Sequence, residues 1–167
     1  MDDPNKEIKL RSEDGKIVEL SKKAAEKSEI LKGMIEDYPD DTEIQVKSVK
    51  GEALIKIKEY LEHYEEIPPK EVSKPVKSND FKECVDEWDY NFIGKIDDND
   101  TLENLILAAN FLNIKPLLIL LAAKIASKIK GVNTQTIRNI FGINELNNEE
   151  KKQFKEDKEY LEQNINI

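Results

Sequence analysis

Side chains that could act as a nucleophile, a general base or a metal ligand are scarce in this chain. Among 167 residues there is one histidine, His63, and one cysteine, Cys84. Cys84 falls in a segment predicted to be a loop, without the basic helix terminus that activates a thiol, and His63 is predicted at the edge of a helix. The six glycines form neither a dinucleotide-binding nor a phosphate-binding pattern. We therefore expect no catalytic, cofactor-binding or metal-binding site, and we interpret the chain as a non-enzymatic binding protein.

Charge and cysteine content narrow the class of partner. The chain has 26 Lys and Arg against 35 Asp and Glu, a formal net charge of −9. Phosphates and anionic lipid surfaces attract a basic face, so we expect binding to neither nucleic acid nor a membrane surface. No apolar run reaches the roughly 20 residues that span a bilayer, and the opening MDDPNKEIKL lacks the apolar segment of a signal peptide. A single thiol indicates a reducing compartment.

The densest apolar stretch, residues 101–143, predicts three short helices in succession. Asp100 is expected to cap the first helix, with Glu103 completing a capping box. Pro116 suits the first position of the second helix and disfavours helical geometry at the preceding residue, so we place the break between the two at Asn113–Lys115.

The second of these helices is apolar on every side from Pro116 to Ala123, PLLILLAA. A surface helix needs only one apolar stripe, so this helix is either central in the core or covered on one side by a partner. Gly131 is expected to stop it, and Asn133 is expected to cap the third helix.

Ahead of this stretch, the pattern predicts two strands, helical residues, a strand and a longer helix. Residues 8–20 alternate around the turn signal Asp14-Gly15 and predict a β-hairpin. Ser21 should cap the helical residues that follow, with an irregularity at 27–29 that favours two short helices. A third strand is predicted within 43–49, and a helix begins after Gly51 and ends before Pro68-Pro69. This order indicates an α+β domain with helices packed to one side of a three-stranded sheet.

Two segments contain too few apolar residues to be stably ordered by themselves. Residues 68–85 are rich in Lys, Glu, Ser and Pro, and we expect a flexible loop because such a composition buries little apolar surface. Trp88, Tyr90, Phe92 and Ile93 then return the chain to the core. A final helix capped by Asn147 or Asn148 has few apolar residues, so it either orders against a partner or frays.

Several segments, taken in chain order, resemble the Skp (S-phase-kinase-associated) adaptor family of the BTB/POZ superfamily. The most specific match is Leu105–Ile114, LILAANFLNI, followed by Ile129–Gly131 and Ile137–Phe141. Weaker matches are Ile8–Gly15, Lys32–Asp37, Tyr60–Tyr64 with Pro68-Pro69, and Trp88-Asp89 with Phe92. Members of this family link a cullin to F-box proteins in SCF (Skp–cullin–F-box) ubiquitin ligases.

The resemblance implies a BTB/POZ-like domain over residues 1–127, with the flexible loop at about 68–85, and a C-terminal helical segment over 128–167 for dimerisation and F-box binding. It implies cullin and F-box partners, no cofactor, and a place in the cytoplasm and nucleus. The family's cullin-facing Asn–aromatic pair falls on Asn110 and Phe111. The F-box surface is expected to comprise Leu118, Ile125, Ile137, Ile140, Phe141, Ile143, Phe154 and Tyr160.

Three departures from the family pattern bear on function. Phe111 stands where tyrosine is usual, which keeps the ring and loses a hydroxyl; the spacing leaves open that Phe111 is a core aromatic. Tyr160-Leu161 takes the place of a Trp-Cys ending, and Thr134 that of a common proline. Phe111 and the changed ending keep one alternative open, a divergent paralogue that binds F-box proteins outside ubiquitin ligases, as a chaperone or assembly subunit. A self-associating BTB scaffold is a separate alternative. A weak homodimer through the uncovered C-terminal surface is expected when no F-box protein is present.

Overall fold

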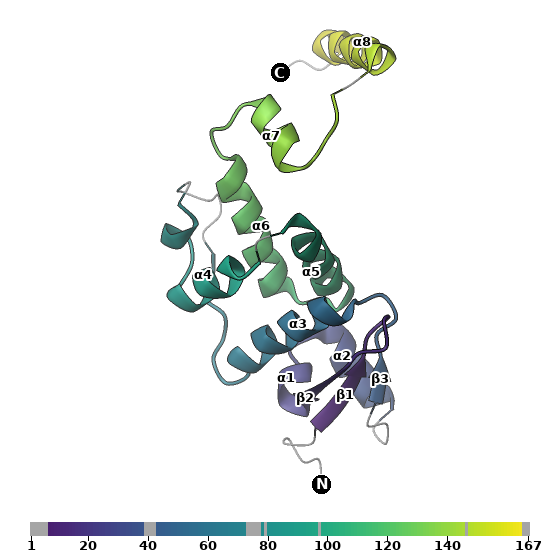
Figure 1. The fold of residues 1–167 in the computed structure, drawn as a ribbon, viewed down its shortest axis with the longest axis vertical. Coiled ribbons are helices and arrows are strands. Elements are labelled where there is room, and N and C mark those ends of the chain that lie inside the picture. Colours follow the sequence, from purple (N-terminus) through teal and green to yellow (C-terminus); the bar gives the residue numbers. More distant parts are fainter. Residues whose placement is uncertain are drawn as a thin grey trace. The chain divides into compact units, whose positions relative to one another are not determined.

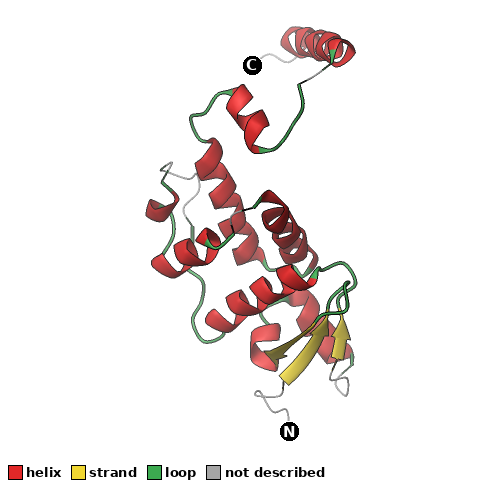
Figure 2. Ribbon diagram, in the orientation of Figure 1, coloured by secondary structure: helices red, strands yellow, loops and turns green. Residues whose placement is uncertain are grey.

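The computed structural model describes residues 7–38, 43–72, 78, 80–96, 98–145 and 147–164. The chain divides into two compact units, Met1–Lys130 and Gly131–Ile167, here called the first unit and the C-terminal unit. Figure 2 shows a small sheet and many helices, so the α+β prediction is confirmed.

The sheet of the first unit has three strands in the order β2-β1-β3. β1 (Glu7–Arg11) and β2 (Ile17–Ser21) form the predicted antiparallel hairpin, with Leu10 opposite Val18. β3 (Glu43–Gln45) pairs parallel to β1 and is shorter than the predicted strand. Alternate residues of β1 and β2 are buried, as the period of two requires when one face lies on a core.

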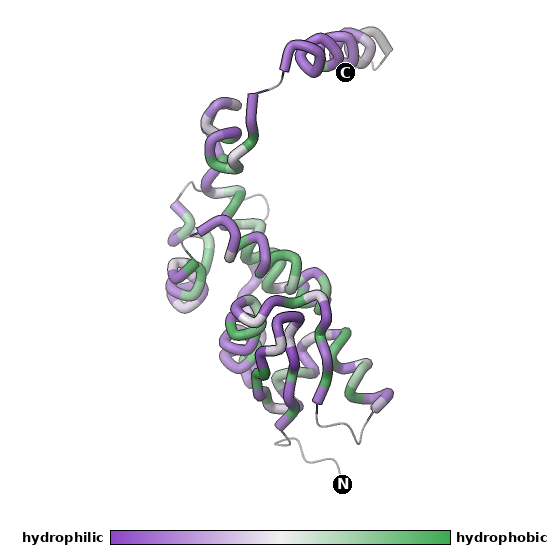
Figure 3. Tube along the Cα trace, turned by 45° about the vertical axis from the view of Figure 1, so that its right-hand side comes forward, coloured by the Kyte–Doolittle hydropathy of each residue, from purple (hydrophilic) through white to green (hydrophobic). Residues whose placement is uncertain are grey.

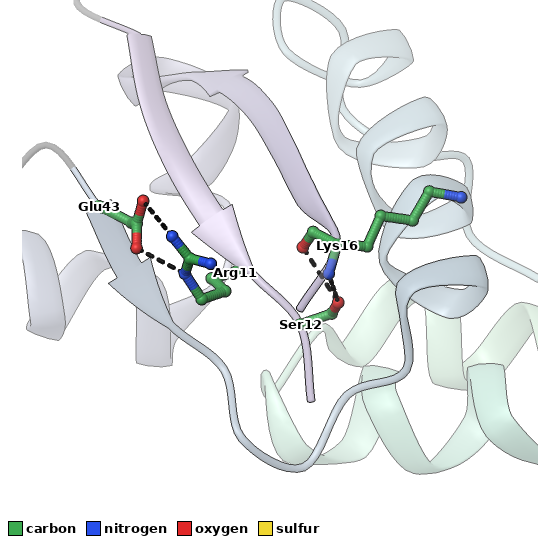
Figure 4. Close-up of polar contacts among 4 residues, drawn as sticks. All are labelled: Arg11, Ser12, Lys16 and Glu43. Atoms are coloured by element: carbon green, nitrogen blue, oxygen red, sulfur yellow. Dashed lines mark hydrogen bonds and ion pairs between the residues drawn. The ribbon is translucent and has the colours of Figure 1, made fainter. Parts of the chain in front are cut away.

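Polar contacts fix the hairpin turn and the neighbouring strands (Figure 4). Arg11 and Glu43 form a two-pronged ion pair between β1 and β3, at 2.7 Å from Nε to Oε1 and 3.1 Å from Nη2 to Oε2. Ser12 Oγ accepts from the backbone N–H of Lys16 at 2.9 Å. Asp14 Oδ1 accepts from the backbone N–H of Gly51 at 2.8 Å. A side chain at Gly51 would place its Cβ 2.7 Å from Lys16 Cδ, so this close approach of turn to helix needs glycine.

Three helices follow and cover the sheet (Figure 1). α1 (Lys22–Ala25) and α2 (Glu29–Asp37) are separate short helices capped by Ser21 and Ser28, as the irregular spacing predicts. α3 (Gly51–His63) packs against β2 and against α5 (Asn99–Phe111). Its stripe of Leu54, Ile57, Tyr60 and Leu61 is buried, which matches its 3.6-residue periodicity.

An aromatic cluster joins α3 to α4 (Glu87–Gly94). The rings of Trp88 and Phe92 stack at 5.0 Å between centroids, and exposed His63 stacks on Trp88 at 3.7 Å. The prediction that Trp88 and Phe92 return the chain to the core is therefore confirmed, and His63 is an edge residue as expected.

The prediction of an unstructured loop through residue 85 is wrong for its last part. Residues 81–83 form a short 3₁₀ helix, η1 (Phe81–Glu83), capped by Asp80. Phe81 is buried in the core, with Lys124 of α6 (Lys115–Ile129) above its ring. One aromatic anchor thus orders a segment whose composition is otherwise polar. The middle of the predicted loop, residues 73–77 and 79, lies outside the described residues.

α5 (Asn99–Phe111) and α6 (Lys115–Ile129) complete the first unit and pack against each other. Asp98, rather than Asp100, caps α5, because its carboxylate accepts from the backbone N–H of Thr101 at 2.6 Å. α6 begins at Lys115, one residue before Pro116, so Lys115 belongs to the helix. The break predicted at Asn113–Lys115 therefore ends before Lys115. Gly131 follows α6 with a φ of +73°, in agreement with its predicted role as a stop.

The C-terminal unit contains α7 (Thr134–Ile140) and α8 (Asn148–Asn164). Asn133 caps α7 as predicted, accepting from the backbone N–H of Thr136 at 2.9 Å. At α8, Asn147 Oδ1 accepts from the backbone N–H of Glu150 at 2.9 Å, and the Glu150 carboxylate accepts from the backbone N–H of Asn147 at 2.8 Å. This reciprocal pair is a capping box, so Asn147 is the cap of the two candidates.

Candidate protein-binding surfaces

The first candidate surface lies at the end of α5, on the side away from the core. Leu105, Ala108 and Ala109 are buried, whereas Leu107, Asn110 and Phe111 face solvent. Leu107 is 56% exposed and Phe111 is 38% exposed. The open question about Phe111 is thereby answered: it is not a core aromatic, and it shares one helix face with Asn110.

The turn after Phe111 has the geometry of a Schellman motif. Asn113 adopts a left-handed backbone with a φ of +52°. The backbone N–H of Ile114 donates to the carbonyl of Ala109 at 2.9 Å, and that of Asn113 donates to the carbonyl of Asn110 at 3.1 Å. These two bonds satisfy carbonyls that a helix end leaves open, and they fix the last turn of α5. Asparagine is tolerated here because it enters the left-handed region more readily than most residues.

The start of α2 holds this turn from the other side. Ser28 is fully buried, and its hydroxyl donates to the carbonyl of Leu112 at 2.5 Å while accepting from the backbone N–H of Leu31 at 3.1 Å. One hydroxyl therefore caps α2 and satisfies the end of α5. Glu29 accepts a hydrogen bond from the Asn113 side chain and pairs with Lys115 at 2.9 Å. The orientation of Asn110 and Phe111 is thus set by contacts from a helix more than 80 residues earlier.

Two of the predicted F-box residues lie on α6, within the first unit. Leu117, Leu120 and Leu121 are buried, whereas Leu118 and Ile125 are partly exposed. Leu118 packs against the edge of the hydrophobic core. The all-apolar segment is therefore mainly a core helix, with partly open positions available for a partner.

The C-terminal unit supplies the other predicted F-box residues. α7 has no buried residue: Ile137 and Ile140 are partly exposed, and Phe141 and Ile143 are 45% and 56% exposed. Gly142, with a φ of +63°, ends α7 in a second Schellman motif, with the backbone N–H of Ile143 donating to the carbonyl of Arg138 at 2.9 Å. The exposed apolar side chains of Phe141 and Ile143 therefore lie on either side of this turn.

α8 is hydrophilic along most of its length (Figure 3). Phe154 and Tyr160 are 62% and 66% exposed. The ion pairs within the helix join Lys at i with Glu at i+4, for example Lys155 with Glu159, which is the less favourable order along a helix. Local capping and weak surface pairs hold this helix, so its few apolar side chains remain open to a partner.

A buried polar pair lies inside the first unit, away from these surfaces. Asp89 is 3% exposed, and neither its Oδ1 nor the Tyr64 hydroxyl has a hydrogen-bond partner of good geometry among the described residues. Burial raises the pKa of Asp89 to about 6, the Tyr64 hydroxyl beside it lowers that pKa in part, and the charge of Asp86 raises it further. The Tyr64 ring packs against Tyr60, His63 and Trp88, and we interpret the pair as a structural group of this aromatic cluster.

No cluster of three potential metal ligands occurs in the part of the chain that the structure describes. Within the same residues no helix is long and apolar enough to cross a membrane. Cys84 is half-buried, and its thiol donates to the backbone carbonyl of Asp80 at 3.5 Å.

Sequence reasoning missed Leu107 and Ser28. Leu107 sits within the family motif LILAANFLNI, and the helical spacing of Leu107 with Asn110 and Phe111 could have placed it on their face. Ser28 carried only the signal of a helix cap; its bond to Leu112 spans 84 residues and has no sequence signature.

Two family models match the chain. The Skp1 family tetramerisation domain, of POZ type, matches residues 6–66, and the Skp1 family dimerisation domain matches residues 115–160. The first match covers the sheet with α1–α3, and the second covers α6, α7 and most of α8.

Curated relatives match over nearly their whole length. The chain is 38% identical over 164 residues to the S-phase kinase-associated protein 1 homolog of Tetrahymena thermophila, covering 98% of each chain. It is 36% identical to the E3 ubiquitin ligase complex SCF subunit sconC of Arthroderma benhamiae, over 93% of this chain and 95% of that one. It is 35% identical to the SCF ubiquitin ligase complex protein SKP1a of Dictyostelium discoideum, with the same coverage. The chain belongs to the Skp1 family.

Proposed function

We propose that this chain is the non-enzymatic adaptor of an SCF-type E3 ubiquitin ligase, joining a cullin to F-box proteins. The observation that carries the proposal is full-length similarity to relatives named as SCF subunits, 38% identical over 98% of the chain in the case of the Tetrahymena homolog. Two exposed apolar surfaces in different units of the chain are what a bridging subunit needs.

In this proposal the cullin binds the end of α5 through Asn110 and Phe111. The F-box protein contacts Ile137, Ile140, Phe141, Ile143, Phe154 and Tyr160 of the C-terminal unit. It also contacts Leu118 and Ile125 of α6. Aromatic and aliphatic side chains exposed to this extent are costly to leave in water, and their burial drives protein association. The protein acts in the cytoplasm and nucleus, and it binds neither nucleic acid nor membranes.

The test is binding of the purified full chain to a cullin N-terminal region and to an F-box peptide, separately and together. We expect a ternary complex. Asn110→Ala with Phe111→Ala should abolish cullin binding and spare the F-box peptide, and Phe141→Asp should do the reverse because it places a charge in an apolar interface. Absence of both interactions, under conditions where a proven adaptor binds, would refute the proposal.

The proposed domain boundary has its own test. Truncation after Ser127 removes α7 and α8 and leaves nearly all of the first unit. The truncated chain should bind the cullin region with unchanged affinity and lose the F-box peptide. Loss of both would place part of the cullin site beyond residue 127.

Phe111 favours one alternative, a paralogue that binds F-box proteins outside ubiquitin ligases. Its ring lacks the hydroxyl expected at this position, so a cullin that relies on that hydroxyl loses a hydrogen bond. F-box binding without measurable cullin binding would support this alternative over the adaptor.

A further inference from the structure

Residues 80–96, here called the α4–η1 segment, form a small peripheral part of the first unit. α4 lies beside α6 on the side of the unit away from the sheet, and η1 packs against both helices (Figure 1). Only five side chains of this segment are buried: Phe81, Asp89, Phe92, Ile93 and Ile96. A segment with few buried apolar side chains opens locally at a low free energy, so we expect α4 and η1 to open without the rest of the core.

Asp89 of α4 is the only acidic side chain that is buried among the described residues. It is 3% exposed, and its Oδ1 has no hydrogen-bond partner of good geometry among those residues. The Trp88 ring before it stacks on Phe92 at 5.0 Å and meets the Tyr64 ring at 5.5 Å between centroids. An ionised carboxylate in such a place loses its water and gains no cation in return, so the closed segment favours the protonated form.

The ionisable groups around Asp89 offer it no paired cation. From α3, the phenols of Tyr60 and Tyr64 face it, and Asp86 at the cap of α4 adds a second negative charge. His63 of α3 stacks on Trp88 instead. The lysine ammonium groups near this cluster lie over other rings: Lys56 of α3 over Phe92, Lys82 of η1 over Tyr90, and Lys124 of α6 over Phe81.

We infer that the α4–η1 segment is a pH-sensitive switch, which stays closed on α3 and α6 when the Asp89 carboxyl is protonated and opens more readily when that carboxyl is ionised. Opening moves Asp89 into water, where its charge is solvated. Burial raises the pKa of Asp89 from 3.8 to about 6 in the closed segment, so opening becomes easier as pH rises from 4 through 6. Because Phe81 leaves its place beside Lys124 in the open form, a rise in pH uncovers part of α6.

Hydrogen exchange of the full chain between pH 4 and 7.5 measures the opening, once each rate is divided by the intrinsic rate at that pH. Amides of α4 and η1 should exchange through an opening that is more populated than that of α5 at every pH. Their open fraction should rise about 30- to 100-fold over this range, because a change of about two in pKa corresponds to about a hundredfold in an equilibrium constant. An opening shared with α5, or an open fraction independent of pH, would overturn the inference.

Replacing the carboxyl tests the assignment to Asp89. Asp89→Asn keeps the shape of the side chain and removes its charge, so the open fraction should change less than about threefold over the same range. A pH dependence that persists in this variant would belong to another group and would refute the switch. Asp80→Asn, the same replacement at the exposed cap of η1, is the matched control; it should behave like the unaltered chain, because asparagine caps a helix as well as aspartate does.

Two neighbours of Asp89 should move the midpoint of the transition in opposite directions. Tyr64→Phe removes a hydroxyl that lowers the pKa of Asp89, so the midpoint should rise. Asp86→Asn removes a charge that raises this pKa, so the midpoint should fall, while asparagine keeps the cap of α4. Midpoints that stay in place in both variants would exclude Asp89 as the switching group, even if Asp89→Asn failed to fold. The experiment uses no partner, so its outcome leaves the adaptor proposal unchanged.

Discussion

The two units of this chain hold their helices by different means. In the first unit, helices rest on a common core of buried side chains such as Leu10, Leu54 and Leu105. In the C-terminal unit, α7 has no buried residue, and every α8 side chain that the structure describes is exposed. What stabilises α7 and α8 is local: the Asn133 cap, the Gly142 turn and the Asn147 capping box.

The difference shows which part of the chain can be stable by itself. Helices gain most of their stability from packing an apolar face, and caps contribute only about 1 kcal/mol each. The first unit therefore has its own source of stability, whereas the C-terminal unit carries apolar side chains that its own two helices do not bury. The substitutions below test this contrast, in order of expected effect.

Truncating a core side chain of the first unit should lower stability, whereas truncating an exposed side chain of the C-terminal unit should lower F-box affinity. Leu105→Ala should lower the free energy of unfolding by about 2–5 kcal/mol, because it leaves a cavity in the core. Phe141→Ala should change it by less than about 0.5 kcal/mol and weaken F-box binding at least about tenfold. Urea unfolding and peptide binding measure the two quantities. A large loss of stability in Phe141→Ala would show that α7 belongs to the core.

The buried Asp89 carboxyl should make stability depend on pH. Its pKa rises from 3.8 to about 6 on folding, so the folded chain holds the proton more tightly and becomes more stable as pH falls from above 6 toward 4. Asp89→Asn should remove this dependence and stabilise the chain relative to the unaltered protein at pH 7.5 by about 1–3 kcal/mol more than at pH 4. Thermal melts across this range would check it; a constant difference would show that Asp89 ionises normally.

Asp14 offers a control of opposite sign. The Ser12 hydroxyl and the backbone N–H of Gly51 lower the pKa of its carboxyl below 3.8. Its contribution is therefore complete above the unfolded pKa and is lost as pH falls through the folded one. Asp14→Asn should cost stability at neutral pH and lose its effect in strong acid.

Removing the Ser28 hydroxyl should affect both stability and the α5 surface. Ser28→Ala leaves the Leu112 carbonyl and the Leu31 N–H without their bonds, at a cost of about 1–2 kcal/mol. Cullin affinity of the folded variant should also fall, because the turn after Phe111 loses its support. Ser21→Ala, which removes a helix cap without a bond to α5, should lower stability and leave cullin affinity intact. Equal cullin affinities for the two variants would restrict Ser28 to a structural role.

Restoring a hydroxyl at position 111 should have the smallest effect. Phe111→Tyr adds an exposed group and should leave the unfolding free energy unchanged. If the cullin presents the expected partner, affinity should rise about two- to tenfold, the value of one added hydrogen bond. Calorimetric titration would measure it; weaker binding would indicate a pocket shaped for phenylalanine.

The sequence predicted most elements because their signals are local. Asp14-Gly15 predicted the hairpin, Ser21 the start of α1, and Asn133 the start of α7, and the order of these elements predicted the α+β fold. The start of α5 was misplaced because Asp98 and Asp100 are equally good caps in sequence, and only the bond to Thr101 distinguishes them.

What the sequence could not supply depends on contacts between distant residues. Burial of Phe81 orders a segment that its neighbours would leave as loop, and Ser28 meets Leu112 only in the folded chain. The exposure of Phe111 could not be predicted either. Helical periodicity shows which residues share a face of the helix, but it does not show whether that face is buried.

Hydrogen exchange of the full chain, alone and with an F-box peptide, tests the contrast between the units most directly. Amides of α3, α5 and α6 should be protected in the free protein, whereas those of α7 and α8 should exchange rapidly and become protected only when the peptide is bound. Protection of α7 and α8 in the free chain equal to that of α5, unchanged by the peptide, would contradict the account.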